Sequence, residues 1–235
     1  MPPQLIDIRS KIKHILLPQQ CLLCAAPSGC NGICCDCNAD LPWQLDPCCP
    51  VCALPSRTGE VCGECLQQPP AFDATLAPLK YKFPINLVLQ RYKYAGLLAV
   101  AKVTGELLAD SLQGKSKLDV IIPMSLHSSR LLERGFNQAA EISRVVTKKL
   151  GIPLELHACS RTRPTKPQAG LSLQERKKNL RGVFACRRPL TGNHVVLLDD
   201  VMTTGASLSE LARTVKDAGA ARVECWVVAR TLKNP

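Results

Sequence analysis

The sequence has few aromatic residues and no long apolar run. Phe, Trp and Tyr make up only 4% of the 235 residues. No stretch approaches the ~18 consecutive apolar residues of a membrane helix, so we expect no transmembrane segment. Near the N-terminus, Leu5, Ile8, Ile12 and Leu16 recur at helical spacing among basic residues, which does not fit a secretory signal peptide. We therefore expect a cytoplasmic protein that begins with an amphipathic helix over residues 1–19.

Histidine is equally rare, whereas cysteine is abundant. The four histidines show no spacing typical of a metal site or a catalytic triad, so we assign them no role. Fourteen cysteines in a chain without an export signal favour metal binding in a reducing compartment over disulfide bonds.

The charge is divided unevenly along the chain. The net charge is +11, yet residues 1–70 hold four basic and six acidic residues, so the whole excess lies in residues 71–235. A basic domain of this kind suits an anionic ligand such as a nucleotide or a nucleic acid; the alternative is a merely solvated basic surface. The shortage of aromatic residues in the basic region 130–188 argues against a groove that stacks bases.

Eight cysteines form an internal repeat between residues 20 and 68. They are arranged as four Cys-x-x-Cys pairs, and the last two pairs repeat the first two at an offset of 28 residues: Cys21, Cys24, Cys34, Cys37, Cys49, Cys52, Cys62 and Cys65. Two such pairs complete a tetrahedral Cys₄ site, so the spacing predicts a double zinc ribbon with two structural zinc ions. We expect the first four cysteines to bind one ion and the last four another. Crossed pairing and an iron–sulfur cluster are the alternatives.

The stretch VVLLDDVMTTGAS, residues 195–207, organises the rest of the chain. Residues 195–198 are apolar and long enough for a buried strand, and Asp199 and Asp200 follow directly. An apolar-periodic helix comes after the stretch and ends near Gly219. The turn between strand and helix consists of small and hydroxyl-bearing residues: Thr203, Thr204, Gly205, Ala206 and Ser207.

The order of strand, acid pair, small turn and helix indicates a phosphate site. A helix N-terminus presents backbone N–H groups and a partial positive charge. Gly205 and Ala206 let the backbone come close to a ligand, and the neighbouring hydroxyl groups add donors, so a phosphate monoester fits the turn. The two carboxylates can accept hydrogen bonds from sugar hydroxyls, or face a hydrated Mg²⁺ that phosphates already hold.

The remainder of residues 71–235 alternates strands and helices, which predicts an α/β fold with a central, mostly parallel sheet. After a strand-like stretch at 71–82, we expect strands at 120–122, 154–158, 183–184, 195–198 and 223–229. We expect helices at 85–94, 97–112, 139–150 and 172–181. The basic segments 125–138 and 161–168 are expected to be loops. Because ligands bind at the carboxyl ends of parallel strands, the first of these loops, with Arg134, is a candidate to bind pyrophosphate.

The stretch 195–207 resembles the signature of the type I phosphoribosyltransferases, which bind phosphoribosyl pyrophosphate (PRPP). The resemblance implies that residues 203–207 hold the 5′-phosphate, that Asp199 and Asp200 hold the ribose hydroxyls, and that Mg²⁺ accompanies PRPP. The hypoxanthine-type enzymes have an Asp where this chain has Thr203. Purine chemistry of their kind is therefore not implied.

The chain as a whole resembles the ComF/GntX family. The cysteine repeat, the segment RGFNQ at 134–138, the segment RTR at 161–163 and the PRPP motif follow one another in the family's order. The resemblance implies three parts: an N-terminal helix at 1–19, a double zinc ribbon at 20–68, and a domain with the type I phosphoribosyltransferase fold at 71–235. It also implies a link to natural competence and to the use of external DNA as a nutrient.

Two functions follow from the resemblance. The first is an enzyme that transfers phosphoribosyl groups, with Asp199 and Asp200 as catalytic residues and Arg134 and Lys93 as candidates for the pyrophosphate end of PRPP. The second is a protein without transferase activity that binds PRPP or a nucleotide and handles single-stranded DNA, together with the competence machinery, during uptake. The sequence gives neither the acceptor substrate nor the oligomeric state.

Overall fold

The computed structural model describes residues 20–28, 32–95, 98–112, 118–164 and 179–232. The chain divides into two compact units, Met1–Leu41 and Pro42–Pro235. The helix expected at 1–19 and most of the helix expected at 172–181 lie outside the described residues, as does most of the basic loop after residue 164. The three-part division at residues 19, 68 and 71 stays a prediction.

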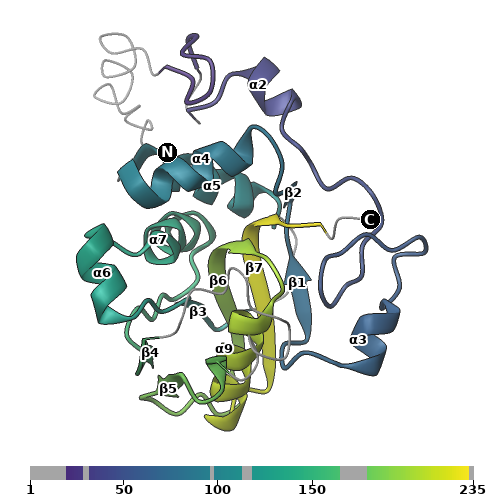
Figure 1. The fold of residues 1–235 in the computed structure, drawn as a ribbon, viewed down its shortest axis with the longest axis vertical. Helices are drawn as coiled ribbons and strands as arrows, with labels where there is room; N and C mark the ends of the chain where they lie inside the picture. The colour runs from purple at the N-terminus through teal and green to yellow at the C-terminus, as the bar shows by residue number, and fades with distance from the viewer. Residues whose placement is uncertain (1–19, 29–31, 96–97, 113–117, 165–178, 233–235) are drawn as a thin grey trace, which may run out of the picture. The chain divides into compact units, whose positions relative to one another are not determined.

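The larger unit is built on a parallel sheet (Figure 1). Its strands run in the order β1 (Ala74–Leu76), β7 (Arg222–Arg230), β6 (His194–Met202) and β3 (Val120–Pro123), and β2 (Leu79–Lys80) also pairs with β7. Every one of these pairings is parallel. The two central strands, β6 and β7, are buried along most of their length because both of their faces are covered. This confirms the predicted α/β class.

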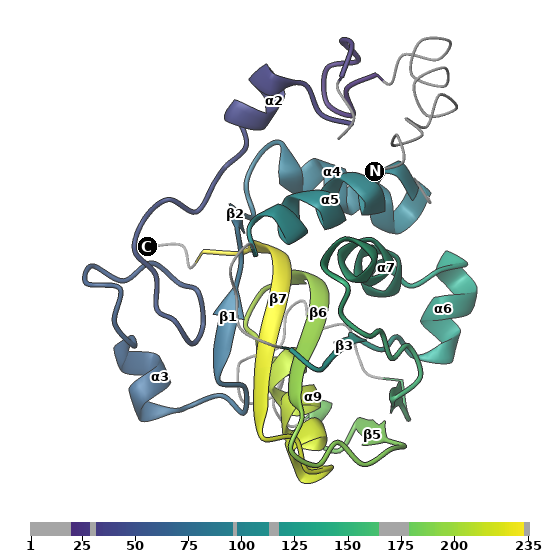
Figure 2. The same cartoon turned by 180° about the vertical axis from the view of Figure 1, so that it is seen from behind.

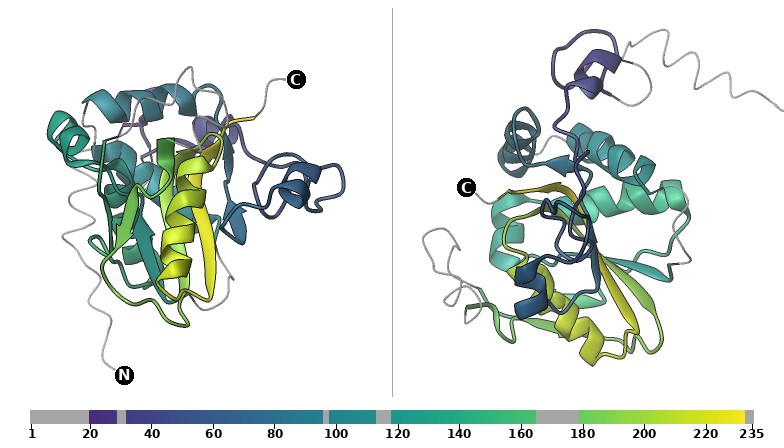
Figure 3. Two further views of the ribbon diagram at one scale, coloured as in Figure 1. Left: turned by 60° about the horizontal axis from the view of Figure 1, so that its bottom comes forward. Right: turned by 90° about the vertical axis from the view of Figure 1, so that its right-hand side faces the viewer.

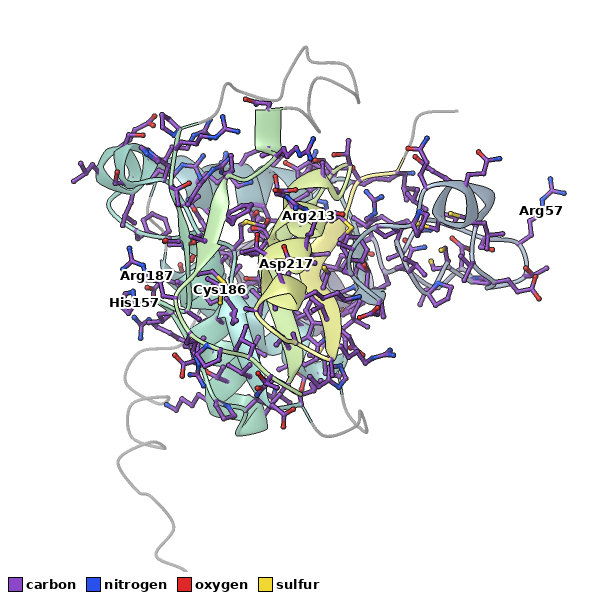
Figure 4. The ribbon with its side chains drawn as sticks, turned by 90° about the horizontal axis from the view of Figure 1, so that it is seen from below. Arg57, His157, Cys186, Arg187, Arg213 and Asp217 are labelled. Atoms are coloured by element: carbon purple, nitrogen blue, oxygen red, sulfur yellow. The ribbon has the colours of Figure 1, made fainter. Side chains whose placement is uncertain are left out.

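Helix α9 (Ala206–Asp217) covers one face of the sheet. It lies in front of β6 and β7 in Figure 1 and behind them in Figure 2, and Figure 3 shows it running along β7. Its apolar side chains, Leu208, Leu211, Ala212 and Val215, share one core cluster with Val195 and Leu197 of β6. Arg213 and Asp217, labelled in Figure 4, lie on its exposed side. This apolar stripe fixes the helix N-terminus at the carboxyl end of β6.

Three more long helices complete the larger unit: α4 (Ile85–Ala95), α5 (Leu98–Asp110) and α7 (Gln138–Leu150). Helices α5 and α7 pack closely against each other; α5 also contacts β7, and α7 contacts β6 and β3. Asn137 caps α7 by accepting the N–H groups of Ala139 and Ala140. These bounds agree with the helices expected from the sequence. None of the helices in the described part of the chain is long and apolar enough to cross a membrane.

Two expectations about the connecting segments were wrong. The segment expected to be a loop contains a short helix, α6 (Ser128–Arg134), because His127 caps its start and Gly135 ends it in the left-handed conformation at φ 76°. The strand expected at 154–158 is absent: only Leu154 makes a bridge, to Ile121, and the chain turns at residues 156–157. The strand lies later, as β4 (Cys159–Arg161), which pairs antiparallel with β5 (Phe184–Cys186).

Candidate functional site

The eight repeat cysteines gather into two separate groups of four. One group is Cys21, Cys24, Cys34 and Cys37, and the other is Cys49, Cys52, Cys62 and Cys65. Within each group the four Sγ atoms lie within 4.8 Å of one another. The Sγ atoms of Cys24 and Cys34 are 3.7 Å apart, and so are those of Cys52 and Cys62. Four sulfurs at about 2.3 Å from one Zn²⁺ would be about 3.8 Å apart, so both donor sets fit a zinc ion.

Both metal sites use the same local fold. In each, a tight turn after the first Cys-x-x-Cys pair places an alanine in the left-handed conformation, Ala25 at φ 60° and Ala53 at φ 56°. In the second site the backbone N–H of Cys62 donates to Cys49 Sγ at 3.3 Å. Hydrogen bonds donated to a sulfur stabilise the thiolate, which is the form that binds metal. Burial raises the pKa of Cys49, but these hydrogen bonds outweigh burial and lower that pKa to about 7. The first site lies in the smaller unit, whereas the second is part of the larger one.

Strand β6 carries the paired acids Asp199 and Asp200. The strand runs on through both of them to Met202, further than the sequence indicated. Asp200 is only 6% exposed, and its Oδ2 forms an ion pair of 2.6 Å with Lys93 Nζ of α4. Burial lowers the pKa of Lys93, but attraction to Asp200 outweighs it and the pKa is raised. Lys93 therefore neutralises one of the two acids.

Asp199 has a different environment. Burial and the negative charge of Asp200 raise the pKa of Asp199 to about 8, against the weaker opposing influence of Lys93. Ionising both carboxyls would leave more negative charge than Lys93 neutralises, so Asp199 keeps its proton up to about pH 8. A ligand that brings hydroxyl donors or a divalent cation to this point would relieve that excess of negative charge.

The turn between β6 and α9 (residues 203–207, hereafter the phosphate turn) has the geometry expected of an anion site. Gly205 is the N-cap of α9 at φ 77°, so it has no side chain to accept the N–H groups of the first helical turn. A Cβ at this position would meet the Phe72 ring at 3.6 Å. Glycine is required here because an L side chain rarely adopts this backbone conformation.

A cavity of about 380 Å³ opens between the phosphate turn and the second metal site. Thr203 and Thr204 of the phosphate turn line it, together with apolar residues such as Leu54 and Phe72. The wall from the second metal site includes Cys52, Glu64 and Cys65. That the cysteine repeat borders the turn could not be predicted from the sequence.

The two basic residues expected at the pyrophosphate end are engaged with protein groups. Lys93 pairs with Asp200, and Arg134 Nη1 donates to Gln138 Oε1 at 3.2 Å. A further arginine, Arg161, interacts electrostatically with Asp199. Burial and repulsion from Arg130 lower the pKa of Arg161, while Asp199 raises it, so all three groups lie within electrostatic reach. Arg161 opens the basic run that the sequence marked only as a loop.

Comparison with known proteins identifies the family of each part of the chain. Residues 12–66 match the family described as "Double zinc ribbon domain", and residues 99–234 match "Phosphoribosyl transferase domain". The chain belongs to the phosphoribosyl transferase domain family. This phosphoribosyl transferase domain protein is 33% identical to the DNA utilization protein YhgH of Salmonella typhimurium over 226 residues, which cover 93% of this chain and 100% of the relative. The Competence protein F of Haemophilus influenzae is 29% identical over 71% of this chain and 76% of its own.

Solved structures similar to this phosphoribosyl transferase domain protein are more distant. The glutamine PRPP amidotransferase from B. subtilis aligns at a TM-score of 0.37 with 20% identity, over 53% of this chain and 25% of that one. The purine phosphoribosyltransferase from Pyrococcus horikoshii aligns at 0.33 with 23% identity, over 54% and 79%. The two family matches and the named relatives confirm the ComF/GntX resemblance and the pairing of a double zinc ribbon with a phosphoribosyltransferase domain.

Proposed function

We propose that this protein binds PRPP with Mg²⁺ and transfers its phosphoribosyl group. The observation that carries the proposal is the acid pair near the carboxyl end of β6, two residues before the phosphate turn at the N-terminus of α9. Backbone N–H groups at that terminus suit the 5′-phosphate, and Asp199, one strand residue before Asp200, suits the ribose hydroxyls. The zinc ions serve as structural supports.

The reaction would be driven by position and charge. Pyrophosphate leaves the anomeric carbon of the ribose, and a nitrogenous acceptor attacks the resulting oxocarbenium-like centre. The carboxylate of Asp199 would orient the ribose and stabilise positive charge. The ion pair with Lys93 holds the Asp200 side chain in place. Arg161 and Arg130, which repel each other without an anion between them, would bind the departing pyrophosphate. The carboxylate oxygens fit Mg²⁺, which when bound would neutralise pyrophosphate charge.

Calorimetry with PRPP and Mg²⁺ tests the binding, and pyrophosphate release in the presence of nucleobases or small amines tests the transfer. We expect Asp199→Ala and Asp200→Ala each to lower affinity or turnover at least about a hundredfold, as loss of a charged contact to substrate does. Asp217→Ala is the matched control because Asp217 is an exposed acid on the outer side of α9 (Figure 4). No heat with the zinc-loaded protein would refute the proposal.

A second function is favoured by the names of the relatives, "DNA utilization protein" and "Competence protein". The excess positive charge of residues 71–235 suits a phosphate backbone. Arg187 and His157 lie exposed together beside β5 in Figure 4. Salt-sensitive binding of single-stranded DNA that Asp199→Ala leaves unchanged, without any pyrophosphate release, would support a DNA-handling protein over an enzyme.

A further inference from the structure

Arg230 is a buried cation at the junction of the phosphate turn and the second metal site. It ends β7 and is only 3% exposed. Its Nε donates to the carbonyl oxygen of Cys52 at 2.8 Å. Its Nη1 donates to the carbonyl oxygens of Met202 at 3.0 Å and of Thr203. One guanidinium thus joins the metal-binding backbone to the last residue of β6 and the first residue of the phosphate turn.

These contacts fix the direction of two peptide groups. In a trans peptide the C=O and the N–H point in opposite directions. Because the carbonyls of Met202 and Thr203 point at Arg230, the N–H groups of Thr203 and Thr204 point away from it. Carbonyl oxygens that turned toward the ligand would repel a phosphate, and Arg230 holds both of them away.

The cost of burying this charge requires a negative partner. In these hydrogen bonds the acceptors of Arg230 are backbone carbonyls, which stabilise a cation less than a carboxylate does. A Zn²⁺ ion with four thiolates carries a net charge of −2, and Cys52 is one of those ligands. The carboxylate of Glu64 also attracts Arg230, and the loaded second site adds its own negative charge. Both therefore stabilise the buried cation that orders the turn.

We propose that Arg230 is a positioning residue through which the second Cys₄ site, and not the first, holds the phosphate turn in its anion-binding conformation. The inference rests on the proposed function for the identity of the ligand. The repeat provides a matched pair for the test, since Cys24 and Cys52 occupy equivalent positions in its two halves. The first site belongs to the other unit, Met1–Leu41.

Hydrogen exchange of the amides of Ala206 and Ser209, which donate to Thr204 Oγ1 and to the Gly205 carbonyl oxygen, reads the turn directly, without any ligand. We expect Arg230→Met, Arg230→Lys and Cys52→Ser each to raise this exchange about tenfold in folded protein, as loss of one charge-assisted contact implies, and Cys24→Ser to leave it unchanged. The affinity for PRPP should fall by a similar factor in the same three variants. Arg230→Lys keeps the charge and so protects the test against simple unfolding.

Three outcomes would overturn the proposal: unchanged exchange in both Arg230 variants, equal effects of Cys24→Ser and Cys52→Ser, or increased exchange spread evenly over the whole sheet. If the wild-type protein binds no PRPP, the proposed function fails while the exchange comparison still decides the role of Arg230.

Discussion

At the scale of single residues, the ion pair between Lys93 and Asp200 links helix α4 to strand β6. The Asp200 side chain is 9% exposed and that of Lys93 is 27% exposed. Removing one partner of a buried pair is costly because the other charge is left without compensation. Lys93→Met should therefore lower the free energy of unfolding by about 2 kcal/mol, measured by urea denaturation.

Two controls separate this effect from a general loss of charge. Lys149→Met breaks an ion pair of the same 2.6 Å length with Asp110, but both partners are about 40% exposed. The loss there should stay below about 1 kcal/mol. The double variant Lys93→Met with Asp200→Asn should recover most of the stability. Equal losses in the two single variants would show that burial of Asp200 is unimportant.

Asp199 should make the stability of the protein depend on pH. Its pKa is raised from the usual 3.8 to about 8, so between these values the folded protein binds more protons than the unfolded chain. The contribution of this group therefore becomes less favourable as pH rises through that window. Asp199→Asn should raise the Tm above wild type at pH 8.5 and by less at pH 5. Asp217→Asn, at an exposed site, should show no such trend; a constant Tm difference for Asp199→Asn would contradict the assignment.

At the scale of helices and strands, the contact between α5 and α7 depends on Gly105. A Cβ on Gly105 would lie 2.7 Å from Val145 Cβ, closer than packed side chains allow. Gly105→Ala gains about 1 kcal/mol of helix propensity, but overpacking costs roughly 1–3 kcal/mol. The packing cost should prevail, with a net loss of about 1 kcal/mol in thermal or urea unfolding.

The matched control for this prediction is Gly63→Ala in helix α3 (Gly63–Gln67). A Cβ there meets nothing within 4 Å, so the substitution should be neutral or stabilising. The double variant Gly105→Ala with Val145→Ala should regain only part of the loss, because it removes Val145 Cγ1, at 2.9 Å, and keeps the Cβ at 2.7 Å. A stabilised Gly105→Ala protein would mean that the two helices separate without cost.

The elements that could be predicted are those whose signal is local. Strand β6 and helix α9 follow from an apolar run and a helical stripe, and the phosphate turn follows from its small residues. Helix α6 was missed because its seven residues carry no apolar stripe, and its ends depend on His127 and Gly135. Strand β4 was misplaced because its position is set by pairing with β5, more than twenty residues later.

The same distinction explains which site residues could be found. The acid pair and the cysteine repeat are contiguous or periodic patterns. Lys93 was placed with pyrophosphate, yet its partner is Asp200, more than a hundred residues away in the chain. Arg230 gave no signal, since it reads as the polar end of an apolar strand until the fold brings Cys52 to it. Roles that depend on tertiary contacts therefore could not be predicted from the sequence.

At the scale of the whole molecule, the two metal sites belong to units whose described residues differ greatly in hydrophobic burial. In Met1–Leu41 the only described residues buried as hydrophobic core are Cys21 and Leu41. The second site lies in Pro42–Pro235, where Cys49, Cys52 and Cys65 form a buried cluster packed by Leu54 and Val61. A unit without a core of its own must obtain its folding free energy from the metal.

Stepwise removal of zinc should therefore proceed in two stages. A chelator should first release about one ion per chain and make residues 20–41 sensitive to protease, while residues 42–235 stay intact. The second ion should leave only at higher chelator concentration or temperature, because its ligands are buried and its loss disturbs the contact of Cys52 with Arg230. Mass spectrometry of the proteolytic fragments, together with a zinc indicator, follows both stages.

Two variants separate the stages: Cys24→Ser should abolish the first stage alone, and Cys52→Ser should abolish the second alone. Simultaneous release of both ions, or protease-resistant residues 20–41 after the first release, would show that the two ribbons fold as one body.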